Sequence, residues 1–195
     1  MKLQDIRLIV GLGNPGKEYE KTYHNAGFLF IEYIINKNPA KIKNQKSKIK
    51  NFEFIKTDGL IFIKSLTFMN ESGIAVKEVM KYFKVNLEEI LIVHDDSDIE
   101  LGNYKLSFGR GSAGHNGVES IIRALKTKNF WRLRIGIGKV SSIKFQVSKE
   151  KAGLPAEAYR AKAGDFVLKK ISKKDLEILN QIFTKSAQKL PIKNS

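Results

Sequence analysis

Three short apolar segments, separated by stretches with helical spacing, constrain the fold of this chain more than any other feature. They are Ile6–Leu12, Ile90–Asp95 and Leu133–Gly138, and each has the composition of a buried β-strand. Between them, over 76–83 and 118–125, apolar residues recur at i, i+3, i+4 and i+7, which is the spacing of one helix face. Strands that alternate with helices predict a layered α/β domain whose central sheet is partly parallel.

The other expected elements follow from turn signals, alternation and capping residues. Lys48–Lys56 and Leu60–Leu66 alternate roughly between polar and apolar residues and flank the turn signal Asp58-Gly59, which predicts a hairpin. Val140–Gly164 has weak periodicity, and we expect it to form a mobile loop or lid; the alternative is a short helix over Leu154–Lys162 within it. The remaining expected elements are a helix between His24 and Asn38, a helix start at Asn86 with Glu89, a half-exposed strand over Asn103–Phe108, and a last helix from Ser172 and Asp175 that turns Leu176, Leu179 and Phe183 inward.

The balance of charged residues points to a polyanionic partner. The 195-residue chain carries 35 Lys and Arg against 20 Asp and Glu, a formal net charge of +15. A field of this sign attracts nucleic acid first and an anionic membrane surface second. The alternative is a solvated, lysine-rich surface from a genome that favours lysine codons. At about 150 residues per domain, the length indicates one domain over residues 1–195.

The residue types that are missing exclude several classes of protein. The sequence has no cysteine, which excludes a disulfide scaffold, a thiolate zinc site and a cysteine nucleophile. No apolar run approaches the roughly 18 residues of a membrane span, and the first apolar run is too short for a signal sequence. We therefore expect a soluble, cytoplasmic protein.

A glycine-rich segment follows the first predicted strand, but it fits a dinucleotide site poorly. Gly11–Gly16, with the sequence GLGNPG, matches the pattern G-x-G-x-x-G. Pro15 holds Asn14 in extended geometry, so the turn does not run directly into a helix. No acidic residue ends a second strand about 20 residues later to bind a ribose. These departures disfavour an NAD-type enzyme.

A group of acidic residues after the second predicted strand raises the question of a divalent cation. Asp96, Asp98 and Glu100 alternate like the ligands of a calcium loop, but Leu101 stands where that loop needs its glycine. A divalent site shared by Asp95, Asp96 and Asp98 stays open beside the alternative of a solvated acidic turn.

The histidines lie in loop-like motifs, in company with asparagines. His24 is in Tyr-His-Asn-Ala-Gly, His94 precedes two aspartates, and His115 is in Gly-His-Asn-Gly. The three could form a zinc site, although none has the i, i+4 spacing of helical ligands. His94, at the end of an apolar strand, has the position of a structural hydrogen-bonder. The asparagines in turn-like contexts are Asn14, Asn25, Asn70 and Asn116. Carboxamide groups near a histidine and an aspartate would suit a site that orients neutral carbonyl groups and a water molecule.

Several motifs follow one another at spacings that are specific as a set. They are GLGNPG (11–16), Tyr19, TYHNAG (22–27), TFMNESG (67–73), HDD (94–96), GRGSAGHNG (109–117) and FWRLRIGIG (130–138). In this order they resemble the bacterial peptidyl-tRNA hydrolase family. The resemblance implies a single three-layer α/β/α sandwich around a mixed, twisted sheet. It also implies an enzyme that hydrolyses the ester between a peptide and the 3′-terminal ribose of tRNA, and so recycles tRNA from peptides released by stalled ribosomes.

The resemblance also implies roles for individual residues. His24 corresponds to the base that activates a water, and Asp95 to the carboxylate that orients it. An imidazole suits this task, because its ordinary pKa of about 6.5 lies near neutrality. Asn14 corresponds to the position that senses whether the α-nitrogen is acylated. The expected substrate-binding positions are Tyr19, Phe68, Met69, Asn70, His115 and Asn116.

The implied partner of the basic surface is the acceptor stem and 3′ end of peptidyl-tRNA, contacted mainly through phosphates. Family members often carry a Lys where this chain has Ser107. Lys105 lies two positions earlier on the same face of the strand, and we predict that it shares the tRNA 5′-phosphate with Arg134. The family implies a monomer that needs no cofactor or metal. The alternative is a non-catalytic RNA-binding protein on the same scaffold, which would not require the base and its carboxylate.

Overall fold

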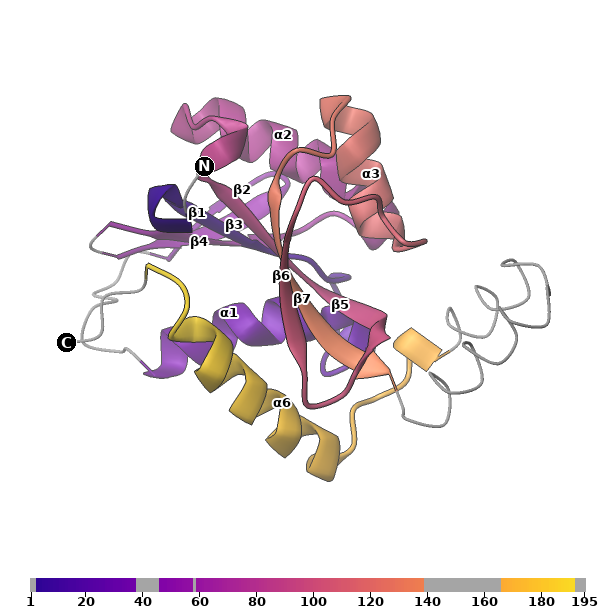
Figure 1. The fold of residues 1–195 in the computed structure, drawn as a ribbon. Coiled ribbons are helices and arrows are strands. Elements are labelled where there is room, and N and C mark those ends of the chain that lie inside the picture. The colour runs from indigo at the N-terminus through magenta and orange to yellow at the C-terminus, as the bar shows by residue number, and fades with distance from the viewer. Residues whose placement is uncertain (1–2, 38–45, 58, 139–165, 192–195) are drawn as a thin grey trace.

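A mixed, seven-stranded sheet forms the centre of the computed structural model (Figure 1), which describes residues 3–37, 46–57, 59–138 and 166–191. Its strands are β1 (Leu8–Gly11), β2 (Lys46–Ile49), β3 (Phe52–Lys56), β4 (Ile61–Ser65), β5 (Ile90–Glu100), β6 (Tyr104–Phe108) and β7 (Trp131–Gly138). Their order is β2-β3-β4-β1-β5-β7-β6. Neighbouring strands are parallel from β4 to β7 and antiparallel on both sides of that block.

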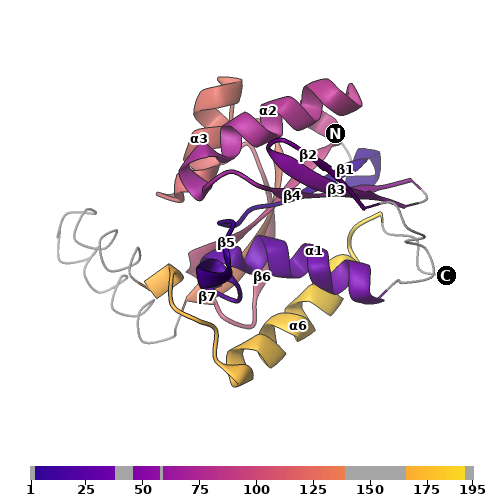
Figure 2. The same cartoon turned by 180° about the vertical axis from the view of Figure 1, so that it is seen from behind.

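Helices cover both faces of this sheet (Figures 1 and 2). One face carries α1 (Ala26–Lys37) and α6 (Lys173–Ala187), and the other carries α2 (Ser72–Phe83) and α3 (Asn116–Leu125). These three layers confirm the predicted α/β/α sandwich with a mixed sheet. Within the described residues, none of the helices combines the length and the apolar character that a membrane span requires.

Two apolar cores, one on each side of the sheet, explain why the central strands are apolar at successive positions. In β1, Ile9 belongs to the core that contains Phe30 of α1 and Phe183 of α6. Its neighbour Val10 belongs to the core that contains Val76 of α2. Because successive side chains of a strand point to opposite faces, a strand covered on both faces needs apolar residues throughout.

The expected hairpin forms between β3 and β4, but its first strand is shorter than predicted. The chain turns at Lys50 and Asn51, and the residues before this turn form β2, which pairs antiparallel with β3. Asn51 O accepts a hydrogen bond from Leu66 N–H at 2.8 Å, and Asn51 Nδ2 donates to Glu78 of α2 at 2.6 Å. These tertiary contacts hold a turn where alternation alone predicted a continuous strand.

The helix start predicted at Asn86 produces a single 3-10 turn over Leu87–Glu89. Glu89 caps this turn, since its Oε2 accepts from Asn86 N–H at 2.8 Å. The helix goes no further because β5 begins at Ile90, where its backbone pairs with β1. The loop or lid predicted at 140–164 lies outside the described residues.

Close packing of the start of α1 against the sheet brings the loop of His24 to β5. A Cβ atom on Gly27 would lie 2.4 Å from Val93 O and 2.5 Å from Leu12 O. A Cβ atom on Gly11 would lie 2.4 Å from Gly27 O. Backbone approaches backbone here at distances that only glycine permits, and the residues just before α1 therefore lie directly beside the sheet.

Candidate active site

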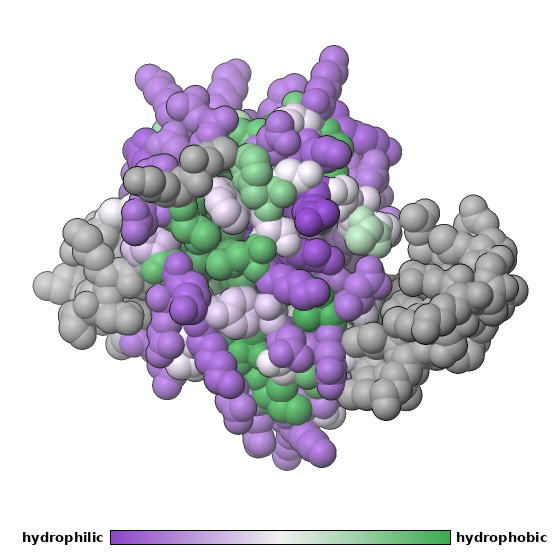
Figure 3. All heavy atoms as spheres, viewed as in Figure 1, coloured by the Kyte–Doolittle hydropathy of each residue, from purple (hydrophilic) through white to green (hydrophobic). Residues whose placement is uncertain are grey.

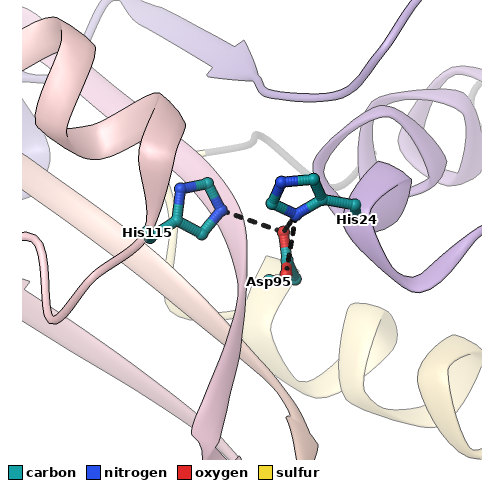
Figure 4. Close-up of side chains that lie close together, drawn as sticks. All are labelled: His24, Asp95 and His115. Carbon is teal, nitrogen blue, oxygen red and sulfur yellow. Dashed lines mark hydrogen bonds and ion pairs between the residues drawn. The ribbon is translucent and has the colours of Figure 1, made fainter. Parts of the chain in front are cut away.

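Three side chains from distant parts of the sequence meet beside β5 (Figure 4). His24 comes from the 3-10 turn Tyr23–Asn25 that precedes α1, Asp95 from β5, and His115 from the residue before α3. His24 Nδ1 lies 2.9 Å from Asp95 Oδ1 and 3.0 Å from Oδ2. His115 Nε2 lies 3.0 Å from Asp95 Oδ1. One carboxylate therefore connects two imidazoles.

The start of α3 determines which nitrogen of His115 carries the proton. His115 is the N-cap residue, and its Nδ1 accepts hydrogen bonds from Gly117 N–H at 3.1 Å and Val118 N–H at 3.3 Å. An acceptor nitrogen has no proton, so the ring proton of neutral His115 is on Nε2. His115 Nε2–H therefore donates to Asp95 Oδ1.

The tautomer of His24 follows from its contact with the same carboxylate. Its Nδ1–H donates to Asp95, which leaves the lone pair on Nε2, an atom without a hydrogen-bond partner among the described residues. Burial lowers the pKa of His24, but the charge of Asp95 and the hydrogen bond to it outweigh burial, so the pKa lies above its ordinary value. His24 Nε2 is thus placed to take a proton from a nearby donor.

Asp95 remains an anion in spite of its burial. Burial alone would raise the pKa of Asp95, but the two imidazoles and their hydrogen bonds hold this pKa far below its usual range. A carboxylate that stays ionised stabilises the imidazolium that forms when His24 takes a proton. The pair therefore has the geometry and charge of a general base with its orienting partner.

His94 packs behind the site. Its Nδ1 donates to Asp95 O at 2.6 Å, and its ring lies edge-on to that of His115, with 4.6 Å between centroids. Burial, followed by the charges of His115 and Arg132, lowers the pKa of His94 well below its ordinary value, so the ring is neutral. These contacts match the structural hydrogen-bonder expected at this position.

The potential ligand atoms of His24, Asp95 and His115 lie within 4.8 Å of one another, a separation at which they could share one metal ion. A metal ion at His115 Nε2 would have to replace its proton while Nδ1 still accepts two backbone hydrogen bonds, which would require an imidazolate. In the cation site that the sequence left open at Asp95, Asp96 and Asp98, the carboxylate of Asp96 already accepts Asp98 N–H at 3.0 Å and Arg134 Nε–H at 2.6 Å. Neither group of side chains fits a resident metal.

Asn25 and Asn14, two of the predicted carboxamides, have different functions in the structure. Asn25 Oδ1 accepts from Asn14 N–H at 2.8 Å, and Asn25 Nδ2 donates to Asn14 O at 3.0 Å, so the side chain of Asn25 holds the GLGNPG turn. Asn14 Oδ1 accepts from Met69 N–H at 2.7 Å. The backbone of Met69 thereby orients Asn14, while the Met69 side chain is buried in the core of α2 and α3. Asn14 Nδ2 has no partner among the described residues.

Of the other predicted substrate positions, Phe68, Asn70 and Asn116 are exposed and Tyr19 is half-buried. Asn70 and Asn116 are exposed, and within the described part of the chain their amide groups make no hydrogen bond. Tyr19 and Phe68 contact each other edge to face, with 6.2 Å between ring centroids, and Phe68 is 49% exposed. The exposed ring of Phe68 offers apolar contact, and the exposed amides of Asn70 and Asn116 offer hydrogen bonds to a ligand.

The two predicted phosphate-binding residues lie side by side. Lys105 of β6 stands directly opposite Arg134 of β7 in the antiparallel register, and Ser107 stands opposite Arg132. Arg134 Nε donates to Asp96 Oδ2, which orients the guanidinium. The face that presents β6 in Figure 3 is mostly hydrophilic, with smaller apolar patches.

Arg132 is a supporting residue that the sequence reasoning did not single out. It is 1% exposed, and its terminal nitrogen donates to Gly111 O at 2.9 Å, in the loop that leads to His115. Burial and, after it, the charge of Arg134 lower the pKa of Arg132 to about 10. Its place in the motif FWRLRIGIG was the signal that could have identified it.

The chain is similar to known proteins along most of its length. A family model described as peptidyl-tRNA hydrolase matches residues 8–194. A peptidyl-tRNA hydrolase of Mycoplasma mycoides is 40% identical over 179 residues, which cover 91% of this chain and 87% of the relative. One from Aquifex aeolicus is 45% identical over 136 residues, covering 69% of this chain and 71% of the relative. The crystal structure of peptidyl-tRNA hydrolase from Acinetobacter baumannii superimposes with a TM-score of 0.73 at 31% identity, covering 94% of this chain and 86% of that one.

Proposed function

This chain belongs to the peptidyl-tRNA hydrolase family, and on that premise we propose how its own residues hydrolyse the substrate. The protein is an ester hydrolase that acts on peptidyl-tRNA. Its proposed role in the cell is to recycle, as a cytoplasmic monomer, the tRNA of peptides released by stalled ribosomes. The observation that carries the mechanism is the hydrogen bond from His24 Nδ1 to Asp95, which leaves Nε2 free to act as a base.

In the proposed reaction, His24 Nε2 takes a proton from a water molecule, whose oxygen attacks the carbonyl carbon of the ester. A tetrahedral oxyanion forms while Asp95 stabilises the imidazolium. The bond to the 3′-oxygen of the ribose then breaks, and this oxygen receives the proton held by His24. The products are a peptide with a free carboxyl group and a tRNA with a free hydroxyl group, and His24 is again neutral.

His115 has a supporting part in this mechanism. Because its Nε2–H donates to Asp95 Oδ1 and its Nδ1 is occupied by the start of α3, neither nitrogen is free for the substrate. We assign His115 the task of holding the Asp95 carboxylate toward His24, in place of the substrate contact expected from the sequence.

Asn14 has the geometry of a hydrogen-bond donor to the substrate. Its Oδ1 accepts a hydrogen bond from Met69 N–H, while Nδ2 has no partner in the part of the chain that the structure describes and can bind a carbonyl oxygen. A peptide or N-acyl group provides such an oxygen next to the α-nitrogen, whereas a free α-ammonium provides only further donors. This difference favours N-blocked substrates, in agreement with the role expected for Asn14.

Asn70 and Asn116 complete the proposed binding surface for the peptide. Their free amides can bind backbone groups, which are the same in every peptide, while Tyr19 and Phe68 contribute apolar contact. Binding through the backbone does not depend on side chains, as an enzyme that accepts many peptides requires.

We assign the tRNA 5′-phosphate to the pair of Lys105 and Arg134. The two stand opposite each other on adjacent strands, and in the described residues the terminal nitrogens of Arg134 have no partner. A guanidinium and an ammonium on one face suit a terminal phosphate, which carries more charge than the phosphates within the chain. The acceptor stem would then lie along this side of the sheet.

Hydrolysis of N-acetylaminoacyl-tRNA in a buffer with a chelator tests the mechanism. The wild-type protein should release the N-acetyl amino acid, and His24→Ala should lower turnover about 10²- to 10⁴-fold. Binding of deacylated tRNA should stay near wild type, because His24 is not part of the proposed tRNA surface. Cleavage by His24→Ala at the normal speed would contradict the assigned base.

A further inference from the structure

The turn that carries His24 is joined to the start of α6 by contacts that the reaction above does not use. Residues 21–23 and 169–171 run antiparallel and exchange backbone hydrogen bonds of 2.8 Å and 3.2 Å. Lys170 Nζ adds a hydrogen bond of 2.6 Å to Glu20 O. The segment before α6 is therefore docked against the chain that leads into the active site.

The side chain of Tyr23 is the centre of this contact. Tyr23 is 4% exposed, and its hydroxyl group donates a hydrogen bond to Asp175 Oδ2 in the first turn of α6. Its ring stacks on Phe166, with 4.6 Å between centroids and 27° between planes. Burial, followed by the hydrogen bond to Asp175, raises the pKa of Tyr23 to about 12, so the hydroxyl group keeps its proton.

Asp175 is itself held by the helix that presents it. Ser172 is the N-cap of α6, and Ser172 Oγ accepts from Asp175 N–H at 3.1 Å. A carboxylate in the first turn of a helix also interacts favourably with the positive end of the helix dipole. The acceptor for the Tyr23 hydroxyl group is therefore fixed by the cap of α6.

Tyr23 and His24 are neighbours in one 3-10 turn, so the contacts of the Tyr23 side chain also hold the backbone that carries His24. This turn follows Lys21, a non-glycine residue in the left-handed region with φ 56°. A residue adopts that conformation only when surrounding contacts hold it there. A general base must stay close to its productive geometry, since a displacement of about 1 Å can cost roughly 10²-fold in rate.

We propose that Asp175 is a positioning residue for hydrolysis, which acts through the Tyr23 hydroxyl group to keep His24 Nδ1 in contact with Asp95. The inference rests on the proposed role of His24 as the base. It adds the start of α6 to the groups that determine the rate, although Asp175 is far from His24 in sequence and does not itself contact the imidazole.

The matched control is a second tyrosine that joins the same two parts of the fold. Tyr33 in α1 forms a hydrogen bond of 2.6 Å between its hydroxyl group and Thr184 Oγ1 in α6. Tyr33→Phe removes a hydroxyl contact to α6 away from the turn of His24. Tyr23→Phe removes the equivalent contact next to His24.

The test compares Tyr23→Phe, Asp175→Ala and Tyr33→Phe in single-turnover hydrolysis of N-acetylaminoacyl-tRNA over a range of pH. Tyr23→Phe and Asp175→Ala should each lower the rate constant by about 10- to 10²-fold and should change KM little. Both should also move the acidic limb of the profile to lower pH, because a loosened His24 loses part of the contact with Asp95 that raises its pKa. An NMR titration of the His24 ring should show the same shift. The double variant of Tyr23→Phe and Asp175→Ala should be no slower than the slower of the two single variants, because both changes remove the same hydrogen bond.

Two outcomes would overturn the inference. One is a lower Tm for Tyr23→Phe with the rate and the acidic limb unchanged, which would show a purely structural contact. The other is an equal loss in Tyr33→Phe, which would show general loosening. If Asp175→Ala does not fold, Tyr23→Phe decides alone. Full activity of His24→Ala would instead overturn the mechanism itself, so the two failures are distinguishable.

Discussion

His24 Nδ1 lies 2.9 Å from Asp95 Oδ1, so the proton of the neutral ring is on Nδ1 and the lone pair is on Nε2. If His24 is the base, as proposed, this contact determines which of its nitrogens accepts the proton and the pH range in which that nitrogen is unprotonated. Because Asp95 raises the pKa of His24, the base is available only above that raised value. The rate should therefore increase with pH and level off above the pKa of His24.

Asp95→Asn should move this acidic limb to lower pH. The amide removes the negative charge that raises the pKa of His24, while burial continues to lower it. The plateau of the rate constant should fall by about 10- to 10³-fold. This loss is smaller than for removal of the imidazole, because the His24 ring stays in place, although its proton is no longer held on Nδ1 by a carboxylate. The measurement is a pH profile of the single-turnover rate constant.

Asp96→Asn is the control for this shift. Asp96 bonds Arg134 and not an imidazole, so its neutralisation should leave the limb where it is. Equal shifts in the two variants would mean that the limb reports the overall charge of the site.

Asn14→Asp should narrow the preference for N-blocked over free aminoacyl-tRNA. The carboxylate can still accept Met69 N–H, but its second oxygen replaces the donor Nδ2, so it attracts an α-ammonium and repels a carbonyl oxygen. The measurement is the ratio of kcat/KM for the two substrates. An unchanged ratio would remove Asn14 from this role, whatever happened to the overall rate.

Lys105→Ala should raise KM, leave kcat nearly unchanged and reduce the salt slope of tRNA binding by about one. Lys105 stands opposite Arg134 in the strand register, where we assign the 5′-phosphate. The effect should disappear with tRNA whose 5′-phosphate has been removed. The control is Lys77→Ala, since Lys77 is an exposed residue of α2 and does not belong to the strands that carry Lys105 and Arg134. Any change in KM caused by Lys77→Ala should be the same with both tRNAs. Equal damage by Lys105→Ala on both tRNAs would assign Lys105 to another part of the tRNA backbone.

Gly27→Ala should destabilise the protein by about 1–3 kcal/mol or more. Its new Cβ atom would meet Val93 O and Leu12 O, which are backbone atoms and cannot rotate away. Gly111→Ala is the control, since a Cβ atom there would have no heavy atom within 4 Å. The two midpoints of urea unfolding measure the difference, and similar midpoints would show that α1 can move away from the sheet without cost.

The layered fold could be predicted from local patterns, and the proposed pair of His24 and Asp95 could be predicted from the resemblance to a known family. Ile6–Leu12 and Ile90–Asp95 are apolar at nearly every position because their strands are covered on both faces, and this requirement is visible in the sequence. His24 and Asp95 belong to motifs whose order resembles a known family, and the structure brings them into contact. The turn at Lys50 and Asn51 was missed, because contacts with distant residues hold it.

The sequence by itself determined which chemical groups are available: three histidines, a group of aspartates and several carboxamides in turns. Only the tertiary structure decided what each group does, because identical side chains differ by the partners that folding gives them. Both polar atoms of the Asn25 side chain bind the backbone of Asn14, whereas Asn14 Nδ2 has no partner among the residues described here. His115 is committed to Asp95 by the start of α3. These assignments depend on contacts between residues far apart along the chain, which local patterns of hydrophobicity and spacing do not encode.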